Sequence, residues 1–204
     1  MTPKRQKLVS DYYSNKIPGV ELLMDNVWDP HNIAAVFRTA DGLGIKTVNM
    51  YYTYNRPGVS RFEESKKLGR KSSASARKWI HYQDVLDIKA FADEKKREGF
   101  VLVGSHLTPN ATKLTDFKFP EKCVIAFGSE SLGMSPEVQA VCDQMVYIPM
   151  VGMVESYNIS VAAGIMMYEL YLQRGQHLMD SSAYTDREPN RNADPKLLNT
   201  PHAT

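Results

Sequence analysis

The stretch VELLMDNVWDPHNIAAVFRTADGLG, residues 20–44, reads as a short apolar strand followed at once by a helix. Asp29 and Pro30 suit the N-cap and the first position of that helix, which we expect over residues 30–43. The glycines at its far end can terminate it. A strand joined directly to a helix is the repeating unit of parallel sheets.

The same alternation continues for most of the chain. Further strands are predicted from branched and aromatic residues at 47–52, 78–82, 100–105, 123–128 and 145–149. Further helices are predicted at 84–98, 136–143 and 157–174. The pattern indicates an α/β fold with a mostly parallel sheet flanked by helices. Ligand chemistry then belongs in the loops at the carboxyl ends of the strands.

The 204 residues are 43% hydrophobic and 24% charged, which is typical of one globular domain. No apolar stretch reaches the roughly 18 residues that span a bilayer, and the N-terminus lacks the apolar core of a secretory signal. We therefore expect a cytoplasmic protein without a membrane partner. Cys123 and Cys142 lack CxxC spacing, which favours buried thiols over a disulfide or a metal site.

Positive charge is concentrated in two segments, although the net charge is only +2. Residues 1–16 carry +3 and residues 56–78 carry +6, as a nucleic-acid phosphate footprint would. A solvated loop in a mildly basic protein is the alternative. The candidate RNA-binding side chains are Lys4, Arg5, Lys7, Arg61, Lys66, Lys67, Arg70, Lys71 and Arg77.

The composition divides the chain into three parts. Residues 1–18 form a basic extension, residues 19–175 form the α/β domain, and residues 176–204 form a polar tail. Neither end is long enough for a second domain with a core of its own.

Arg38 lies on the polar side of the helix at 30–43. An apolar stripe must face the sheet, and its residues are Ile33, Val36, Phe37, Ala40 and Leu43. Arg38 then projects opposite the stripe, with His31 beside it and Asn32 at the flank. The arginine is either simply solvated or reserved for an RNA phosphate or a site completed by another subunit.

The segment FGSESLGMSP, residues 127–136, joins a predicted strand to a predicted helix. Its two glycines would let backbone amides approach a ligand closely. The pattern is neither GxxxxGK[ST] nor GxGxxG, so a nucleoside triphosphate or a dinucleotide is not indicated. Glu130 is a structural carboxylate or a catalytic one, while Ser135 and Pro136 suit a helix start.

The segment IPMVGMVESYNISVAAGIMMYE, residues 148–169, leads into a helix that is apolar almost all round. Such a helix is buried in a core or in a subunit interface. Ser156 suits its N-cap, and Asn158 is the polar residue with the least obvious structural role. Capping or turn stabilisation, and a role in a site, remain open for both.

In this order and at these separations, the three segments resemble the SPOUT class of methyltransferases, specifically the SpoU/TrmH family. The resemblance covers residues 20–173, with 30–44, 128–133 and 148–162 as its three motifs. It implies a deep C-terminal trefoil knot, bound S-adenosyl-L-methionine, a homodimer, and methyl transfer to a ribose 2'-hydroxyl of RNA.

The resemblance also implies site residues. The catalytic positions of the family fall on Arg38, Asn32, Glu130, Ser156 and Asn158. The methyl-donor contacts fall on Ser105, His106, Leu107, Gly128, Ser129, Gly133, Ile148, Met150, Tyr157 and Ala162. Two positions depart from the family pattern, because Tyr157 replaces the usual leucine and Ser129 replaces asparagine or glutamine.

Roles follow from the resemblance for the catalytic positions. Arg38 would grip a phosphate and stabilise the alkoxide in the partner's site, while Asn32 would hold Arg38 or the first helical turn. Glu130 would brace its loop. Ser156 and Asn158 would orient the loop beside the methyl donor.

A tRNA guanosine is the preferred substrate, because the short N-terminus leaves no room for a separate RNA-binding domain and residues 148–153 are similar to the tRNA enzymes of the family. An rRNA 2'-O-methyltransferase and a non-catalytic RNA-binding relative are the alternatives. A serine hydrolase is disfavoured because no GxSxG elbow surrounds a serine. No metal is expected.

Overall fold

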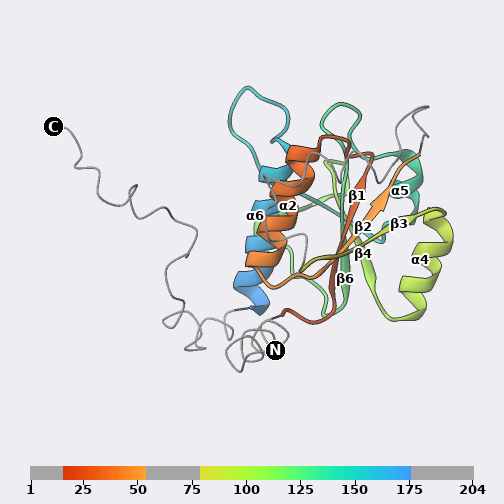
Figure 1. Cartoon of the computed structure of the whole chain (residues 1–204). Helices are drawn as coiled ribbons and strands as arrows, with labels where there is room; N and C mark the ends of the chain where they lie inside the picture. The colour runs from red at the N-terminus through yellow and green to blue at the C-terminus, as the bar shows by residue number, and fades with distance from the viewer. Residues whose placement is uncertain (1–15, 54–78, 176–204) are drawn as a thin grey trace, which may run out of the picture.

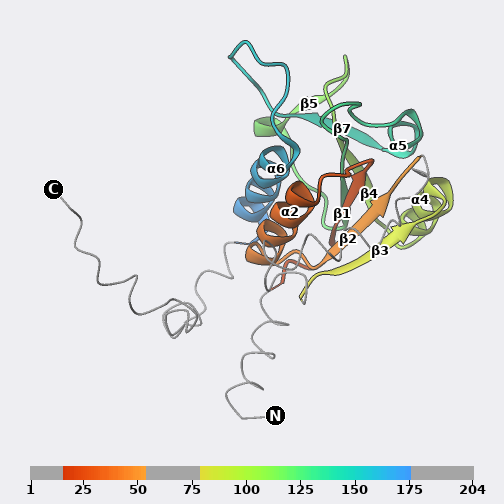
Figure 2. The ribbon, with the colours of Figure 1, turned by 45° about the horizontal axis from the view of Figure 1, so that its top comes forward.

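A parallel sheet forms the centre of the protein (Figure 2). The computed structural model describes residues 16–53 and 79–175, and in these parts seven strands pair in the order β3-β2-β1-β6-β4-β7-β5. All six pairings are parallel, which confirms the predicted sheet. The strands are β1 Val20–Asp25, β2 Thr47–Tyr51, β3 His81–Val85, β4 Val101–Ser105, β5 Thr112–Lys113, β6 Cys123–Phe127 and β7 Gln144–Tyr147.

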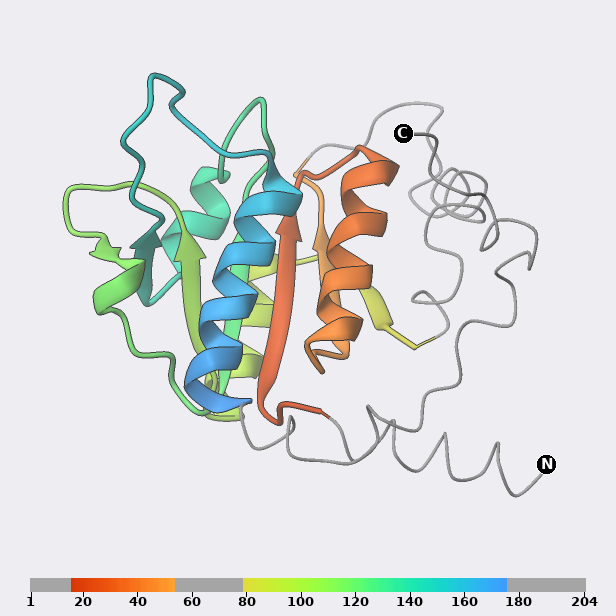
Figure 3. The same cartoon turned by 90° about the vertical axis from the view of Figure 1, so that its left-hand side faces the viewer.

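Helices cover both faces of the sheet (Figure 1). On one face lie α2 Pro30–Gly42 and α6 Ile159–Arg174, and on the other lie α4 Ile88–Arg97 and α5 Pro136–Val141. A short 3-10 turn, η2 Leu114–Asp116, follows β5. Figure 3 shows α2 and α6 side by side in front of the sheet.

Helices α2 and α6 meet at Gly164 of α6. A Cβ placed there would lie 3.9 Å from the Cγ2 of Thr39 in α2, which is ordinary van der Waals contact. Beneath the helices, β1 is apolar toward both layers: Leu22 and Met24 join the core under α2 and α6, and Leu23 joins the core under α4. A strand buried on both faces accounts for the continuous apolar runs in the sequence.

Two predicted boundaries near β3 are wrong. The strand lies at His81–Val85 rather than at 78–82, and α4 begins at Ile88 rather than at residue 84. The strand is polar because it lies at the sheet edge, where the exposed Gln83 donates to the buried Asn49 at 2.8 Å. Asp87 is the true N-cap of α4, and its carboxylate accepts from the next turn at 3.0 Å.

The predicted start of α6 is also wrong. The helix begins at Ile159, and its N-cap is Asn158 rather than Ser156. Asparagine caps as well as serine does, so the sequence offered two equivalent candidates. The elements β5 and η2 were not predicted, because a two-residue polar strand carries no apolar signal. The caps Asp29 and Ser135 are confirmed.

Several predictions fall outside the described residues. These are the basic extension up to residue 15, the basic segment 54–78 and the tail from residue 176, with the candidate RNA-binding side chains that they carry. Among residues 16–53 and 79–175, no helix is long and apolar enough to cross a membrane. The same residues contain no cluster of metal-ligand side chains. Both cysteines are free thiols, with Cys123 buried and Cys142 partly buried.

Candidate active site

The loops that follow three of the strands, β1, β6 and β7, lie above the carboxyl edge of the sheet (Figures 1 and 3). They are residues 26–29 after β1, 128–135 after β6 and 148–158 after β7. From β1 the chain continues outward to β2 and β3 on one side, then crosses to β4 on the other side, and β6 later pairs between β1 and β4. Ligands of open parallel sheets bind where the strand order reverses in this way.

Three of the five expected catalytic residues are joined by side-chain hydrogen bonds. Asn32 lies in the first turn of α2, and its Nδ2 donates to Glu130 Oε1 in the loop after β6. Asn158 Nδ2, at the start of α6, donates to Asn32 Oδ1 at 3.2 Å. The structure therefore connects one residue from each of the three sequence motifs.

The same side chains begin the two helices. Asn158 Oδ1 accepts the backbone N–H of Ser160 at 2.9 Å and its hydroxyl at 2.6 Å. Asp29 Oδ1 accepts the backbone N–H of His31 at 2.8 Å, while Asp29 Oδ2 accepts from Asn32 Nδ2 at 3.4 Å. Asn32 thus contacts the cap of its own first helical turn, which is one of the two roles expected for it. Two helix N-termini and the loop after β6 thus share one set of polar contacts.

Arg38 lies apart from this cluster. It is exposed on α2, on the side away from the buried Val36 and Phe37, which confirms the predicted orientation. At 1.5 Å of rise per residue, it is about 9 Å along the helix axis from Asn32. His31 is exposed on the same side of the helix.

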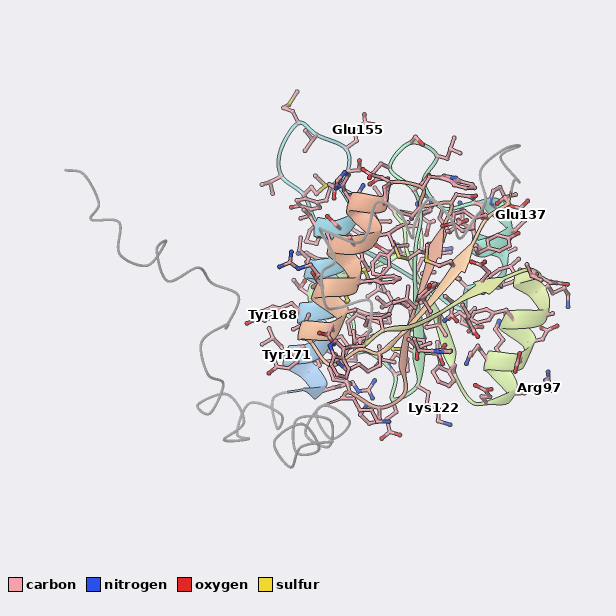
Figure 4. All side chains as sticks on the ribbon, viewed as in Figure 1. Arg97, Lys122, Glu137, Glu155, Tyr168 and Tyr171 are labelled. Carbon is pink, nitrogen blue, oxygen red and sulfur yellow. The ribbon has the colours of Figure 1, made fainter. Side chains whose placement is uncertain are left out.

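Ser156 does not join the cluster either. Its side chain is exposed, and it makes no hydrogen bond with any residue in the described part of the chain. Ser156 and Asn158 were expected to orient this loop together, but no hydrogen bond joins their side chains. Neighbouring Glu155 lies near the tip of this loop, far from the sheet (Figure 4).

The loop after β6 closes on itself. Ser129 and Gly133 exchange two backbone hydrogen bonds of 2.9 Å, and Ser129 Oγ accepts the N–H of Leu132 at 3.2 Å. Gly133 has a φ of 67°, and a Cβ on Gly128 would collide with the Gly133 backbone. The backbone N–H groups of Ser129, Leu132 and Gly133 therefore form hydrogen bonds within the loop. The glycines allow the loop to close and do not expose these three amides to a ligand.

Two polar residues below the loop were missed from the sequence. Asp25 is fully buried at the end of β1, and its Oδ2 accepts the backbone N–H of Ser135 at 2.5 Å. Burial raises the pKa of the Asp25 carboxyl above its ordinary value. Asn26 has a φ of 54° and bonds both to Asp25 and to Thr53. An Asp-Asn pair directly after an apolar strand was the available signal.

The expected methyl-donor residues occupy two places. Ser105 ends β4 between its neighbours β6 and β7, and the ring of His106 lies 3.8 Å from the position that a Cβ on Gly133 would take. Ile148 instead lines an apolar hollow of about 510 Å3 beside α6. The remaining expected contacts lie elsewhere around this edge. Leu107 is in the loop after β4, Met150 and Tyr157 are in the loop after β7, and Ala162 is in α6.

The outer side of α6 is apolar and exposed. Tyr168 is 51% exposed and points away from the sheet (Figure 4). It lines the hollow together with Val161, Gly164 and Ile165. The other side of the same helix is buried in the core through Ala163, Met166, Met167 and Leu170.

Comparison with known proteins assigns the family. Residues 19–168 match the SpoU rRNA Methylase family. The chain belongs to this family. The resemblance drawn from the three motifs is thereby confirmed. The cluster of Asn32, Glu130 and Asn158 lies within the matched residues.

Individual SpoU relatives cover most of the chain. The tRNA (guanosine(18)-2'-O)-methyltransferase of Escherichia coli K12 is 29% identical over 194 residues, which are 94% of this chain and 81% of the relative. The 23S rRNA (guanosine-2'-O-)-methyltransferase RlmB of Acinetobacter baylyi is 32% identical over 83% of this chain and 66% of its own.

Solved SpoU structures share the fold. The A. aeolicus TrmH/SpoU tRNA modifying enzyme matches with a TM-score of 0.74 and 27% identity over 86% of this chain and 85% of its own. The SpoU methyltransferase AviRb from Streptomyces viridochromogenes, solved in complex with AdoMet, matches with a TM-score of 0.64 and 25% identity over 76% of this chain and 58% of its own.

Proposed function

We propose that the protein is an RNA ribose 2'-O-methyltransferase that uses S-adenosylmethionine and acts on a tRNA guanosine. Family membership and relatives that methylate guanosine ribose in tRNA or rRNA support the reaction class. The observation that carries the proposal is the joining of Asn32, Glu130 and Asn158, one from each motif, at the ligand-binding edge of the sheet.

The residues at this edge fit a sulfonium nucleoside. Leu107 and Leu132 are 70% and 73% exposed on the loops after β4 and β6, where an adenine ring could cover them. The carboxylate of Glu130 is exposed nearby and complements a positive sulfur. A relative of the same fold, AviRb, was solved with AdoMet.

The chemistry requires positioning more than covalent help. When bound, S-adenosylmethionine supplies a methyl group on a charged sulfur that is already an activated leaving group. Arg38 holds the phosphate beside the reacting ribose and stabilises the developing alkoxide. It does not serve as the base, because a guanidinium stays protonated at neutral pH. The proton of the hydroxyl goes to the phosphate or to water.

Arg38 acts on the site of a second copy of the chain. It faces away from its own sheet and lies about 9 Å along α2 from Asn32. The exposed apolar side of α6 is suited to bury against that second copy, as homodimer interfaces are rich in apolar residues. The dimer then completes each site, and its two sites are equivalent by symmetry.

Further features follow from the same proposal. Residues 1–18 and the basic segment 56–78 supply salt-dependent affinity for RNA phosphates, and residues 176–204 form a tail outside the methyltransferase domain. The family's C-terminal trefoil knot is proposed for the stretch that contains the second and third motifs. The enzyme works in the cytoplasm, where its tRNA substrate is found.

Incubation with labelled methyl donor tests this function. We expect label in bulk tRNA, and nucleoside mass spectrometry should find it as 2'-O-methylguanosine. A parallel reaction on 23S rRNA tests the second candidate, which the 32% identity to the Acinetobacter rRNA enzyme favours. Label in neither RNA, at donor concentrations that saturate the protein, would reject the proposed function.

A further inference from the structure

Asp29 and Ser160 lie at the two ends of the hydrogen-bonded set around Asn32 and Asn158. Ser160 Oγ donates to Asn158 Oδ1 at 2.6 Å, and Asn32 Nδ2 donates to Asp29 Oδ2 at 3.4 Å. Neither residue belongs to the catalytic or methyl-donor positions described above. Asp29 is the N-cap of α2, and Ser160 lies in the first turn of α6.

The ends determine which way the two amides face. Asn158 Oδ1 receives two donors from Ser160, so the amide nitrogen of Asn158 must face Asn32. The oxygen of Asn32 then accepts, and its nitrogen must face the carboxylates of Asp29 and Glu130. An ionised carboxylate can only accept. Every hydrogen bond of the set therefore points the same way, from donor to acceptor: Ser160 donates to Asn158, Asn158 donates to Asn32, and Asn32 donates to the two carboxylates.

This direction limits what each amide can offer a ligand. The two N–H bonds of Asn32 are directed to Asp29 and Glu130, so no donor of Asn32 remains for a substrate. Asn158 keeps one N–H, because only one is directed to Asn32. Glu130 keeps its second carboxylate oxygen.

We infer that Asp29 and Ser160 are positioning residues, which hold Asn32 and Asn158 in the orientation that leaves Glu130 and one N–H of Asn158 facing the substrate. The inference rests on the proposed function for the identity of that substrate. All of these groups are at least partly exposed, so water can replace each bond and the set adds little to folding. Its effect should appear in turnover, because small displacements of reacting groups are costly there.

Asp29 can be tested without loss of its helix cap. Asp29→Ser and Asp29→Asn both keep an oxygen that caps α2. Serine lacks the second oxygen, and asparagine places an NH2 group against the NH2 of Asn32. We expect kcat to fall about tenfold in Asp29→Ser and further in Asp29→Asn, with the melting temperature and donor KM unchanged. Equal kcat in all three proteins would mean that Asp29 is only a cap.

Ser160 offers a matched pair of variants. Ser160→Ala removes the hydroxyl but keeps the backbone N–H that Asn158 caps, and Ser160→Thr restores a hydroxyl at the same place. We expect kcat to fall in the alanine variant and to recover in the threonine variant. Unchanged kcat in Ser160→Ala, or a loss that threonine does not recover, would overturn the role of Ser160.

A measurement without turnover separates the inference from the proposed function. If the wild-type chain methylates no RNA, the function fails, and the inference is then judged by NMR of the Asn32 side-chain amide. The chemical shifts of both amide protons should differ from those of a fully hydrated asparagine in the wild type, and in Asp29→Ser one of the two should move to the hydrated value. Identical shifts in the two proteins would overturn the inference.

Discussion

Asn158 donates a hydrogen bond to Asn32 at 3.2 Å, although the two residues are 126 positions apart in the chain. Each lies at the N-terminal end of a helix, α6 and α2, and these helices pack against each other on one face of the sheet. The contact therefore fixes the beginning of one helix relative to the other. Glu130 joins the pair from a third loop.

Replacing Asn158 separates its two roles. Asn158→Asp keeps the helix cap but loses the donor to Asn32, whereas Asn158→Ala loses both. We expect wild-type stability for the aspartate variant and a loss of about 1 kcal/mol for the alanine variant. Both should bind the methyl donor more weakly by calorimetry and turn over more slowly. Wild-type activity in Asn158→Asp would show that the amide contact is dispensable.

Closure of the loop after β6 depends on Gly128. A Cβ there collides with the backbone of Gly133, so Gly128→Ala should lower the free energy of unfolding by about 1–3 kcal/mol. Gly152 is the matched control, because a Cβ there meets nothing within 4 Å. Urea denaturation of the two alanine variants makes the comparison. Equal stabilities would disprove the steric account of this loop.

Asp25 should make stability depend on pH. Burial raises its pKa above the ordinary value of 3.8, so the native state binds the proton more tightly than the unfolded state does. Proton binding by Asp25 therefore contributes to the free energy of unfolding in full below about pH 3.8, and this stabilisation is lost as the pH rises through the pKa of the folded state. The free energy of unfolding, measured by urea between pH 4 and pH 7, should fall more with rising pH in the wild type than in Asp25→Asn. Parallel curves would contradict a raised pKa.

The outer side of α6 should hold the dimer together. Tyr168 is 51% exposed there, and Tyr168→Glu would bury a charge in the interface. Light scattering should show a dimer for the wild type and a monomer for this variant, which should also lose activity. Leu86→Glu is the control, because Leu86 is 80% exposed in the loop from β3 to α4, a helix on the opposite face of the sheet from α6. A Tyr168→Glu dimer would place the interface elsewhere.

Local signals predicted much of the fold. Asp29 with Pro30, and Ser135 with Pro136, mark helix starts through contacts within one turn, and both caps are found. The strand His81–Val85 was misplaced because its pairing, rather than its polar composition, determines it. Asn158 was missed as a cap because Ser156 offered the same local chemistry.

The site was less accessible to sequence reasoning. Resemblance named Asn32, Glu130 and Asn158, but only the fold shows that they bond to one another across separations of 98 and 126 residues. The supporting Asp25 carboxylate was missed for the same reason, since its partner Ser135 is 110 residues away. Contacts of this kind depend on strand order, which residue spacing alone does not determine.

The central claim is that Arg38 of one subunit serves the site of the other. Arg38→Ala alone should reduce turnover at least about a hundredfold, with dimerisation and donor binding retained. Mixing it with Asn158→Ala, after subunits exchange, should restore about one quarter of wild-type tRNA methylation, because about half of the dimers are mixed and each has one complete site. If the mixture stays as inactive as the separate variants although mixed dimers form, each site uses its own arginine and the account is wrong.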